Sequence, residues 1–216
     1  MYKLFYFPGN ANLAPHMLLE EIGAPYELVL VDRDNNAHKS PEYLKLNPSG
    51  RIPVLVDGDL VIHETAAICL HLADRHPDAD LAPALGTRER ALFYKWLVYL
   101  TNTLQAELIT YFYPERLVDD AAAAAQVKAH AEARISGEGG MLDILERHLG
   151  KGGNPWLLGS HYTAADPYLL MLARWTRGMA KPARNRPNFS RYLAAMILRP
   201  AVARTFAQES LNAPLY

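Results

Sequence analysis

The strongest constraint on the fold is a change of pattern about eighty residues into the chain. Before it, short strand-like runs alternate with helix-like segments, and after it no convincing strand pattern remains. Residues 3–7 form an aromatic-rich run ended by a Pro-Gly pair, and residues 26–31 form a second run with alternating apolar positions. Between them, residues 14–22 have a proline in the first helical turn and Gly23 after the last. This order predicts a βαβ unit with parallel strands.

A hairpin and another helix follow. Two brief apolar runs, residues 52–56 and 60–62, flank an Asp-Gly turn, which is a strong local signal for a β-hairpin. Residues 41–46 indicate a short helix before the hairpin, and residues 64–74 carry apolar side chains at helical spacing after it. The order βαβ, ββα and then helices predicts a small thioredoxin-like α/β domain that carries an all-helical domain.

The remainder of the chain is expected to be helical. Residues 88–112 place large apolar side chains three or four positions apart, as one face of a long helix requires. Further helices are expected over residues 120–136, 141–149, 168–175 and 191–208, with interruptions at Pro182, Pro187 and Pro200. We therefore expect a thioredoxin-like domain at residues 1–76, a linker at residues 77–87, and a C-terminal helical bundle domain at residues 88–216.

Composition excludes several classes of function. The 22 Lys and Arg residues nearly balance 23 Asp and Glu residues, so no charge excess indicates a nucleic acid or membrane partner. Apolar runs fall far short of the ~18 residues that span a bilayer. A single cysteine, Cys69, excludes an intramolecular disulfide, and the histidines have no metal-ligand spacing, so we expect no metal. With no signal-peptide pattern at the start, the expected location is the cytoplasm.

Four motifs in order along the chain carry a resemblance to a known family. They are Tyr6-Phe7-Pro8 leading to Ala14-Pro15-His16, the loop Asn47-Pro48-Ser49-Gly50-Arg51-Ile52-Pro53, the run His63-Glu64-Thr65-Ala66, and Gly159 followed by Tyr162-Thr163-Ala164-Ala165-Asp166. Over almost its whole length the chain resembles cytosolic glutathione S-transferases, especially the bacterial beta-like members. The resemblance implies a detoxification transferase that takes glutathione as co-substrate and is a homodimer.

The resemblance also implies how glutathione is held. A cis Ile52-Pro53 bond would present the main chain of Ile52 to the peptide as an added strand does; a trans proline that opens an edge strand is the alternative. Glu64 and Thr65 begin a helix, where free N–H groups and the dipole favour a carboxylate. In the family the hydroxyl residue holds the γ-glutamyl carboxylate and the acid meets the ammonium group; an ordinary helix-start acid is the alternative.

Three cations are candidates for the glycine carboxylate of glutathione: Arg51, His38 and Lys39, although loop cations are often only solvated. Thr163 and Asp166 match a capping box, which is a folding role and not a catalytic one.

The catalytic loop departs from the beta-like pattern. The thiol of glutathione must be ionised to react, and an unperturbed thiol with a pKa near ~8.5 is mostly protonated at neutral pH. Where beta-like enzymes carry cysteine and then serine, this chain has Ala11 and Asn12. Two side-chain donors remain for the thiol, Asn12, which we favour, and Tyr6; backbone N–H groups are a third possibility. The alternative interpretations, which need no resemblance to a family, are that Asn12 is a helix cap and that Tyr6 is a core aromatic residue.

The acceptor side also differs. Beta-like enzymes have histidine and then lysine where this chain has Gln105 and Ala106, so the expected acceptor is an apolar electrophile. Candidate lining residues are Tyr99, Asn102, Gln105 and Tyr111, although aromatic residues at helical spacing are more often core. These departures leave a second hypothesis, a non-catalytic protein that binds glutathione or sequesters ligands. A disulfide reductase would need a loop thiol, which Ala11 does not provide.

Overall fold

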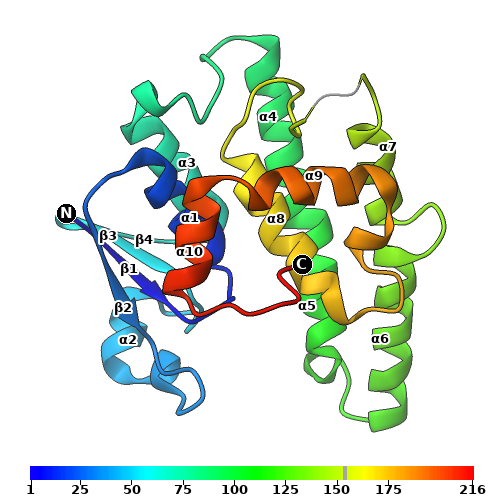
Figure 1. The fold of residues 1–216 in the computed structure, drawn as a ribbon. Helices are drawn as coiled ribbons and strands as arrows, with labels where there is room; N and C mark the ends of the chain where they lie inside the picture. Colours follow the sequence, from blue (N-terminus) through cyan, green and yellow to red (C-terminus); the bar gives the residue numbers. More distant parts are fainter. Residues whose placement is uncertain (153–154) are drawn as a thin grey trace. The chain divides into compact units, whose positions relative to one another are not determined.

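The computed structural model describes residues 1–152 and 155–216, and these form two compact units (Figure 1). The N-terminal unit contains Met1–Pro83 together with Ile197–Ala213, and the helical unit contains Ala84–Met196 together with Pro214–Tyr216. The expected boundary assigns everything after residue 88 to the helical domain. The structure differs because the segment after residue 196 returns to pack on the N-terminal unit.

A four-stranded sheet forms the centre of the N-terminal unit. Its strands are β1 (Tyr2–Tyr6), β2 (Tyr26–Leu30), β3 (Val54–Asp57) and β4 (Leu60–His63), in the spatial order β2-β1-β3-β4. Strand β2 runs parallel to β1, whereas β3 is antiparallel to β1 and to β4. The predicted βαβ unit and hairpin of a thioredoxin-like domain are confirmed.

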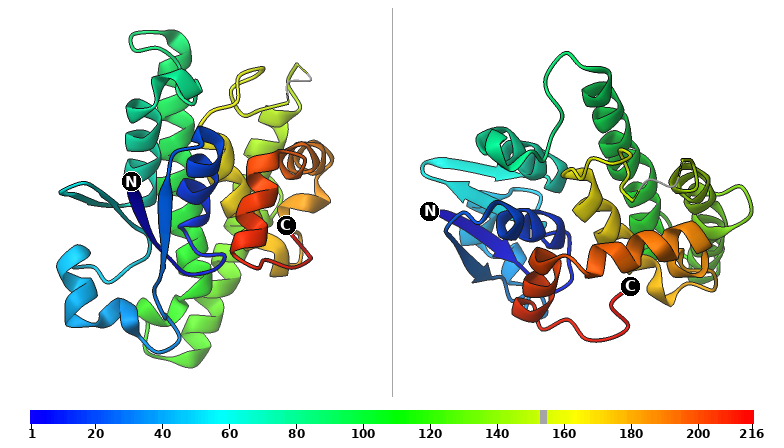
Figure 2. Two further views of the ribbon diagram at one scale, coloured as in Figure 1. Left: turned by 60° about the vertical axis from the view of Figure 1, so that its left-hand side comes forward. Right: turned by 45° about the horizontal axis from the view of Figure 1, so that its top comes forward.

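Four α-helices complete this unit: α1 (Leu13–Ile22), α2 (Pro41–Leu46), α3 (Thr65–Arg75) and α10 (Pro200–Gln208). Gly23 ends α1 with a φ of 71°, the left-handed conformation that glycine adopts without strain. Helix α2 supplies Tyr43 to an apolar cluster with Val31, Ile52 and Val54. Helices α3 and α10 pack on α1, and both views in Figure 2 show α10 beside α1.

The helical unit contains α4 (Arg88–Val98), α5 (Ala106–Phe112), α6 (Ala121–Ser136), α7 (Met141–Leu149), α8 (Ala165–Trp175) and most of α9 (Pro187–Ile197). The long helix expected over residues 88–112 is interrupted by a π-helical segment, Tyr99–Gln105. The Tyr168 hydroxyl of α8 accepts a hydrogen bond from Thr101 and donates one to Gln105, both within this π-helical segment. Pro200 likewise divides the expected helix over residues 191–208 into α9 and α10.

Short 3₁₀ segments connect the longer elements. They are Ala37–Lys39, Pro77–Ala79, Pro114–Arg116, Thr176–Gly178 and Ala183–Asn185. Within the described residues, no helix combines the length and apolar character needed to cross a membrane.

The capping box before α8 is confirmed. The Asp166 carboxylate accepts hydrogen bonds from the Thr163 N–H at 2.8 Å, and also from the Leu157 N–H at 2.9 Å. The Tyr192 hydroxyl donates a third at 3.1 Å. Because Asp166 is completely buried, these contacts join α8, α9 and the preceding loop into one core. Its role is structural, as the sequence predicts.

Candidate functional site

Ile52, two residues before β3, has main-chain polar groups that are available for pairing. The Arg51 C=O accepts hydrogen bonds from the Tyr43 hydroxyl and from Asn47 Nδ2, each at 2.8 Å. The Ile52–Pro53 bond that follows is cis, as the sequence resemblance implies. Within the described part of the chain, the N–H and C=O groups of Ile52 have no hydrogen-bond partner. A fixed donor and acceptor next to a strand are what an extended peptide needs for pairing.

The start of α3 lies opposite this segment. Val54 of β3 pairs with His63 of β4. Ile52 lies two residues before Val54 and Thr65 two residues after His63, so both lie beyond the same end of this strand pair. Glu64 joins β4 to α3 with a φ of 72°, a conformation that costs energy for any residue except glycine. Its side chain is 69% exposed, whereas Thr65 at the helix start is buried. The unpaired N–H groups of the first helical turn and an exposed carboxylate therefore meet at this point.

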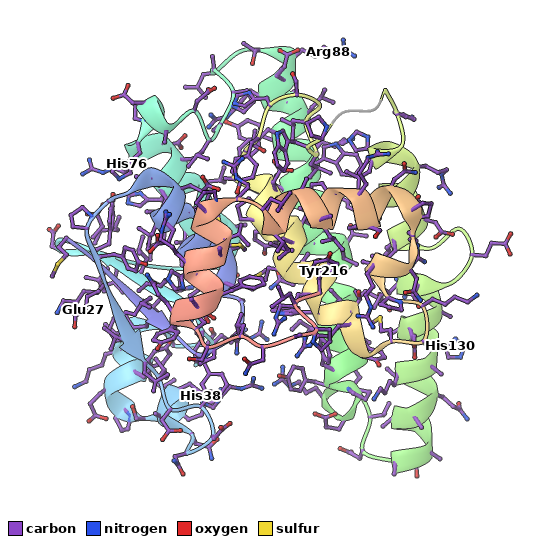
Figure 3. All side chains as sticks on the ribbon, viewed as in Figure 1. Glu27, His38, His76, Arg88, His130 and Tyr216 are labelled. Atoms are coloured by element: carbon purple, nitrogen blue, oxygen red, sulfur yellow. The ribbon has the colours of Figure 1, made fainter. Side chains whose placement is uncertain are left out.

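Basic side chains lie near the turn that leads into Ile52. His38 and Lys39 lie in the 3₁₀ segment beside α2 (Figure 3), and the Lys39 ammonium donates to the Ser49 C=O at 3.4 Å. Gly50 has a φ of 59°, and a Cβ there would lie 2.8 Å from Lys39 Nζ. Burial, with the charges of Lys39 and Arg33, lowers the pKa of His38. His38 and Lys39 therefore lie against the turn before Arg51, whose side chain is exposed. Arg33, whose charge acts on His38, lies outside every motif of the sequence and was therefore not among the predicted site residues.

The two predicted thiol donors have different surroundings. Asn12 is completely buried; its Oδ1 accepts from the Phe7 N–H at 3.1 Å and its Nδ2 donates to Glu209 Oε1 at 2.8 Å. Its side chain makes no helix-cap hydrogen bond, so the alternative that it is an ordinary cap is wrong. Tyr6, at the end of β1, is half-buried, and among the described residues its hydroxyl has no hydrogen-bond partner.

Glu209 is a residue that sequence reasoning missed. It follows α10, far from Asn12 along the chain, and it is only 1% exposed. No motif surrounds it, and only the return of the chain to the N-terminal unit brings it to the loop.

The predicted acceptor residues all belong to the helical unit. The Tyr99 hydroxyl donates to the Met141 C=O at 3.2 Å, and burial raises the pKa of Tyr99 to about 12. Gln105 accepts from Tyr168, whereas Asn102 is exposed. Tyr111 is half-buried, with the Lys128 ammonium 4.9 Å from its ring centroid. Tyr99 and Gln105 therefore have structural contacts, while Asn102 has its side chain in solvent.

The described residues contain neither a cluster of possible metal ligands nor an exposed thiol. Across residues 1–152 and 155–216, no group of three or more His, Cys, Asp or Glu side chains could hold a metal ion. Cys69 is completely buried, and burial raises the pKa of its thiol far above the usual range. It is an inert core residue, as expected.

Comparison with known proteins identifies the family. The family model described as "Glutathione S-transferase, N-terminal domain" matches residues 1–74, and "Glutathione S-transferase, C-terminal domain" matches residues 139–195. Glutathione S-transferase 3 of Zea mays is 34% identical over 223 residues, which cover 98% of this chain and 96% of the plant protein.

Solved structures have the same fold. A glutathione transferase homolog from Sulfitobacter, crystallised with bound glutathione, has a TM-score of 0.88 and 26% identity, and the match covers 98% of this chain and 99% of that one. A bacterial beta class glutathione S-transferase from Sphingomonas chungbukensis has a TM-score of 0.81 and 30% identity, with 97% and 100% covered. Because both family models match in the expected order and the relatives match over nearly the whole length, this chain belongs to the glutathione S-transferase family.

Proposed function

We propose that the protein is a glutathione transferase, which adds the thiolate of glutathione to an apolar electrophile. The observation that carries the proposal is the unpaired main chain of Ile52 opposite Thr65 at the start of α3. A solved relative over the full length is described with bound glutathione, which supports the same ligand here.

In this proposal the backbone of glutathione pairs with Ile52, next to Pro53, as a short added strand. The γ-glutamyl carboxylate accepts hydrogen bonds from the Thr65 N–H and hydroxyl, where the dipole of α3 adds a favourable charge. The exposed Glu64 carboxylate attracts the ammonium group of the same glutamyl end. The strained φ of Glu64 supports this role, because such conformations concentrate at ligand-binding positions.

The opposite end of glutathione carries the glycine carboxylate. We assign it to three side chains around the Gly50 turn, His38, Lys39 and Arg51. Burial, together with the charges of Lys39 and Arg33, lowers the pKa of His38, so His38 would contribute as a neutral hydrogen-bond donor and the other groups as cations.

The thiol requires a donor that stabilises its ionised form. We now favour the Tyr6 hydroxyl over Asn12, because the Asn12 amide already bonds to Phe7 and Glu209 inside the protein. The N-terminus of α1 adds its dipole to this donor. Replacing Tyr6 with phenylalanine should then lower kcat at neutral pH at least tenfold while glutathione binding changes little, whereas the same loss in Asn12→Ala alone would return the role to Asn12.

The acceptor would contact the helical unit, where Tyr99, Asn102, Gln105 and Tyr111 offer aromatic and neutral polar groups without a formal charge. This set favours an apolar, aromatic electrophile. The physiological role that follows is removal of such compounds in the cytoplasm.

A homodimer is part of the proposal. Helix α4 exposes Leu92 and Val98, at 39% and 60%, and strand β4 exposes Leu60 and Val61, at 44% and 40%. Exposed apolar side chains favour association with a second copy, and closed twofold dimers are the commonest assembly.

Two assays on the same purified protein test the function. Calorimetry should detect saturable binding of glutathione, and conjugation of an aryl halide should give measurable turnover. Binding without turnover supports the second candidate, a non-catalytic glutathione-binding protein, which is favoured by the use of Asn12 inside the protein and by the absence of a loop thiol at Ala11. Absence of binding contradicts both.

A further inference from the structure

A buried carboxylate from the C-terminal segment holds the loop after β1. Glu209 Oε2 accepts from the Gly9 N–H at 2.8 Å. Its Oε1 accepts from Asn12 Nδ2 at 2.8 Å and lies 2.7 Å from His16 Nδ1. The three donors come from the loop and the first turn of α1, and all four residues belong to the N-terminal unit.

The same network extends to β2 and α10. His16 Nε2 lies 2.7 Å from Gln208 Oε1 and 3.1 Å from the Tyr26 hydroxyl. The Tyr26 hydroxyl donates to Glu20, and Gln208 Nε2 donates to the same carboxylate at 2.9 Å. His16, which contacts Glu209, is therefore also held by residues of β2 and α10. A carboxylate held in this way can fix the position of the loop.

The burial of Glu209 makes its hydrogen bonds necessary for the stability of this arrangement. A carboxylate that is 1% exposed must receive hydrogen bonds, because an unsatisfied buried charge is far more costly than an exposed one. Asn12 transmits the constraint, since its Oδ1 accepts from the Phe7 N–H, next to Tyr6. The loop between Tyr6 and α1 is thus positioned by a residue about two hundred positions away in sequence.

We propose that Glu209 is a positioning residue for the thiol of glutathione: through Gly9 and Asn12 it holds the loop so that Tyr6 and the start of α1 stabilise the bound thiolate. This inference rests on the proposed function. It separates two tasks, because Ile52 and Thr65, which we assign to the glutathione backbone, lie on other segments. A change at Glu209 should affect the thiol and leave the affinity for the rest of the tripeptide nearly unchanged.

The test compares Glu209→Gln with Glu21→Gln. Glu21 is a matched control, because it also joins α1 to the returning segment, through two hydrogen bonds from Arg199, but has no contact with the loop among the described residues. Two quantities are measured: the pKa of the bound glutathione thiol, from ultraviolet thiolate absorbance against pH, and the Kd of S-methylglutathione, whose sulfur cannot ionise.

We expect Glu209→Gln to raise the thiol pKa by about one pH unit, which lowers kcat/KM about tenfold at pH values below it. The Kd of S-methylglutathione should stay within about twofold, and Glu21→Gln should change neither quantity. An unchanged thiol pKa in Glu209→Gln, or an equal rise in both variants, would overturn the proposal. If Glu209→Gln does not fold, Glu209→Asp, which keeps the carboxylate but shortens its reach to Gly9 and Asn12, decides by the same two criteria. Failure of the wild type to bind S-methylglutathione would instead contradict the proposed function.

Discussion

Replacing Asp166 with alanine tests how the core of the helical unit is held together. The buried carboxylate accepts hydrogen bonds from the Leu157 N–H, the Thr163 N–H and the Tyr192 hydroxyl, all between 2.8 and 3.1 Å. Alanine leaves the two N–H donors without this acceptor, whereas the Tyr192 hydroxyl keeps a second acceptor, the Asp166 C=O at 3.0 Å. Each unsatisfied buried donor costs about 1–3 kcal/mol. For two donors the lower end of this range sums to about 2 kcal/mol, more than the ~1 kcal/mol of an ordinary cap. We therefore expect the free energy of unfolding to fall by about 2 kcal/mol.

Urea unfolding followed by circular dichroism measures this loss, with an unchanged m-value showing that the same cooperative transition is observed. Asp120→Ala is the matched control, because Asp120 caps α6 with one hydrogen bond, from the Ala123 N–H at 2.8 Å, and is exposed. It should lose about 1 kcal/mol. The reasoning is refuted if Asp166→Ala loses no more than Asp120→Ala.

The same carboxyl gives stability a pH dependence. Burial raises the pKa of Asp166 from 3.8 to about 6, against the opposing effect of its hydrogen bonds. Between these two values the native protein binds more protons than the unfolded chain, so the free energy of unfolding falls as pH rises from about 4 to about 6. At 1.36 kcal/mol per pH unit, the fall is up to about 3 kcal/mol. This part of the pH dependence should be absent in Asp166→Asn.

Three further changes test the site and the assembly. Thr65→Val removes the hydroxyl assigned to the glutamyl carboxylate, and calorimetry should show glutathione binding weakened about tenfold, as for one hydrogen bond to a charged group. Gly50→Ala should lose more than about 1–2 kcal/mol in urea unfolding and also weaken glutathione binding, because its Cβ would lie 2.9 Å from the His38 C=O and 2.8 Å from Lys39 Nζ; Gly58→Ala, with a φ of 64° and open space, should lose only about 1–2 kcal/mol through backbone strain. Val98→Glu should convert a dimer to a monomer in sedimentation, and an unchanged mass would exclude this face of α4 from the interface.

The elements that the sequence predicted well have strong local signals. Gly23 and the Pro-Gly pair after β1 mark ends of elements, and the Asp-Gly turn marks the hairpin, because glycine and proline restrict the backbone whatever the tertiary context. The Thr163–Asp166 capping box is local for the same reason.

The features that the sequence did not predict depend on contacts between distant residues. The π-helical turn at Tyr99–Gln105 is in contact with Tyr168 of another helix, and the apolar spacing of residues 88–112 is compatible with one straight helix. The environment of Asn12 depends on Glu209, which no spacing rule connects to it. In the candidate site, motifs therefore indicated the residues that we propose to contact glutathione, while the contacts of Glu209 with the loop after β1 could be found only in the structure.

The most direct measurement of the central claim is the response of individual backbone amides to glutathione. In a titration followed by ¹⁵N nuclear magnetic resonance, the amide signals of Ile52 and Thr65 should shift more than those of the sheet core and saturate together with one molecule of glutathione per chain. If glutathione saturates the protein while both signals stay in place, or if no amide responds, glutathione does not bind as the geometry of β3 and α3 indicates.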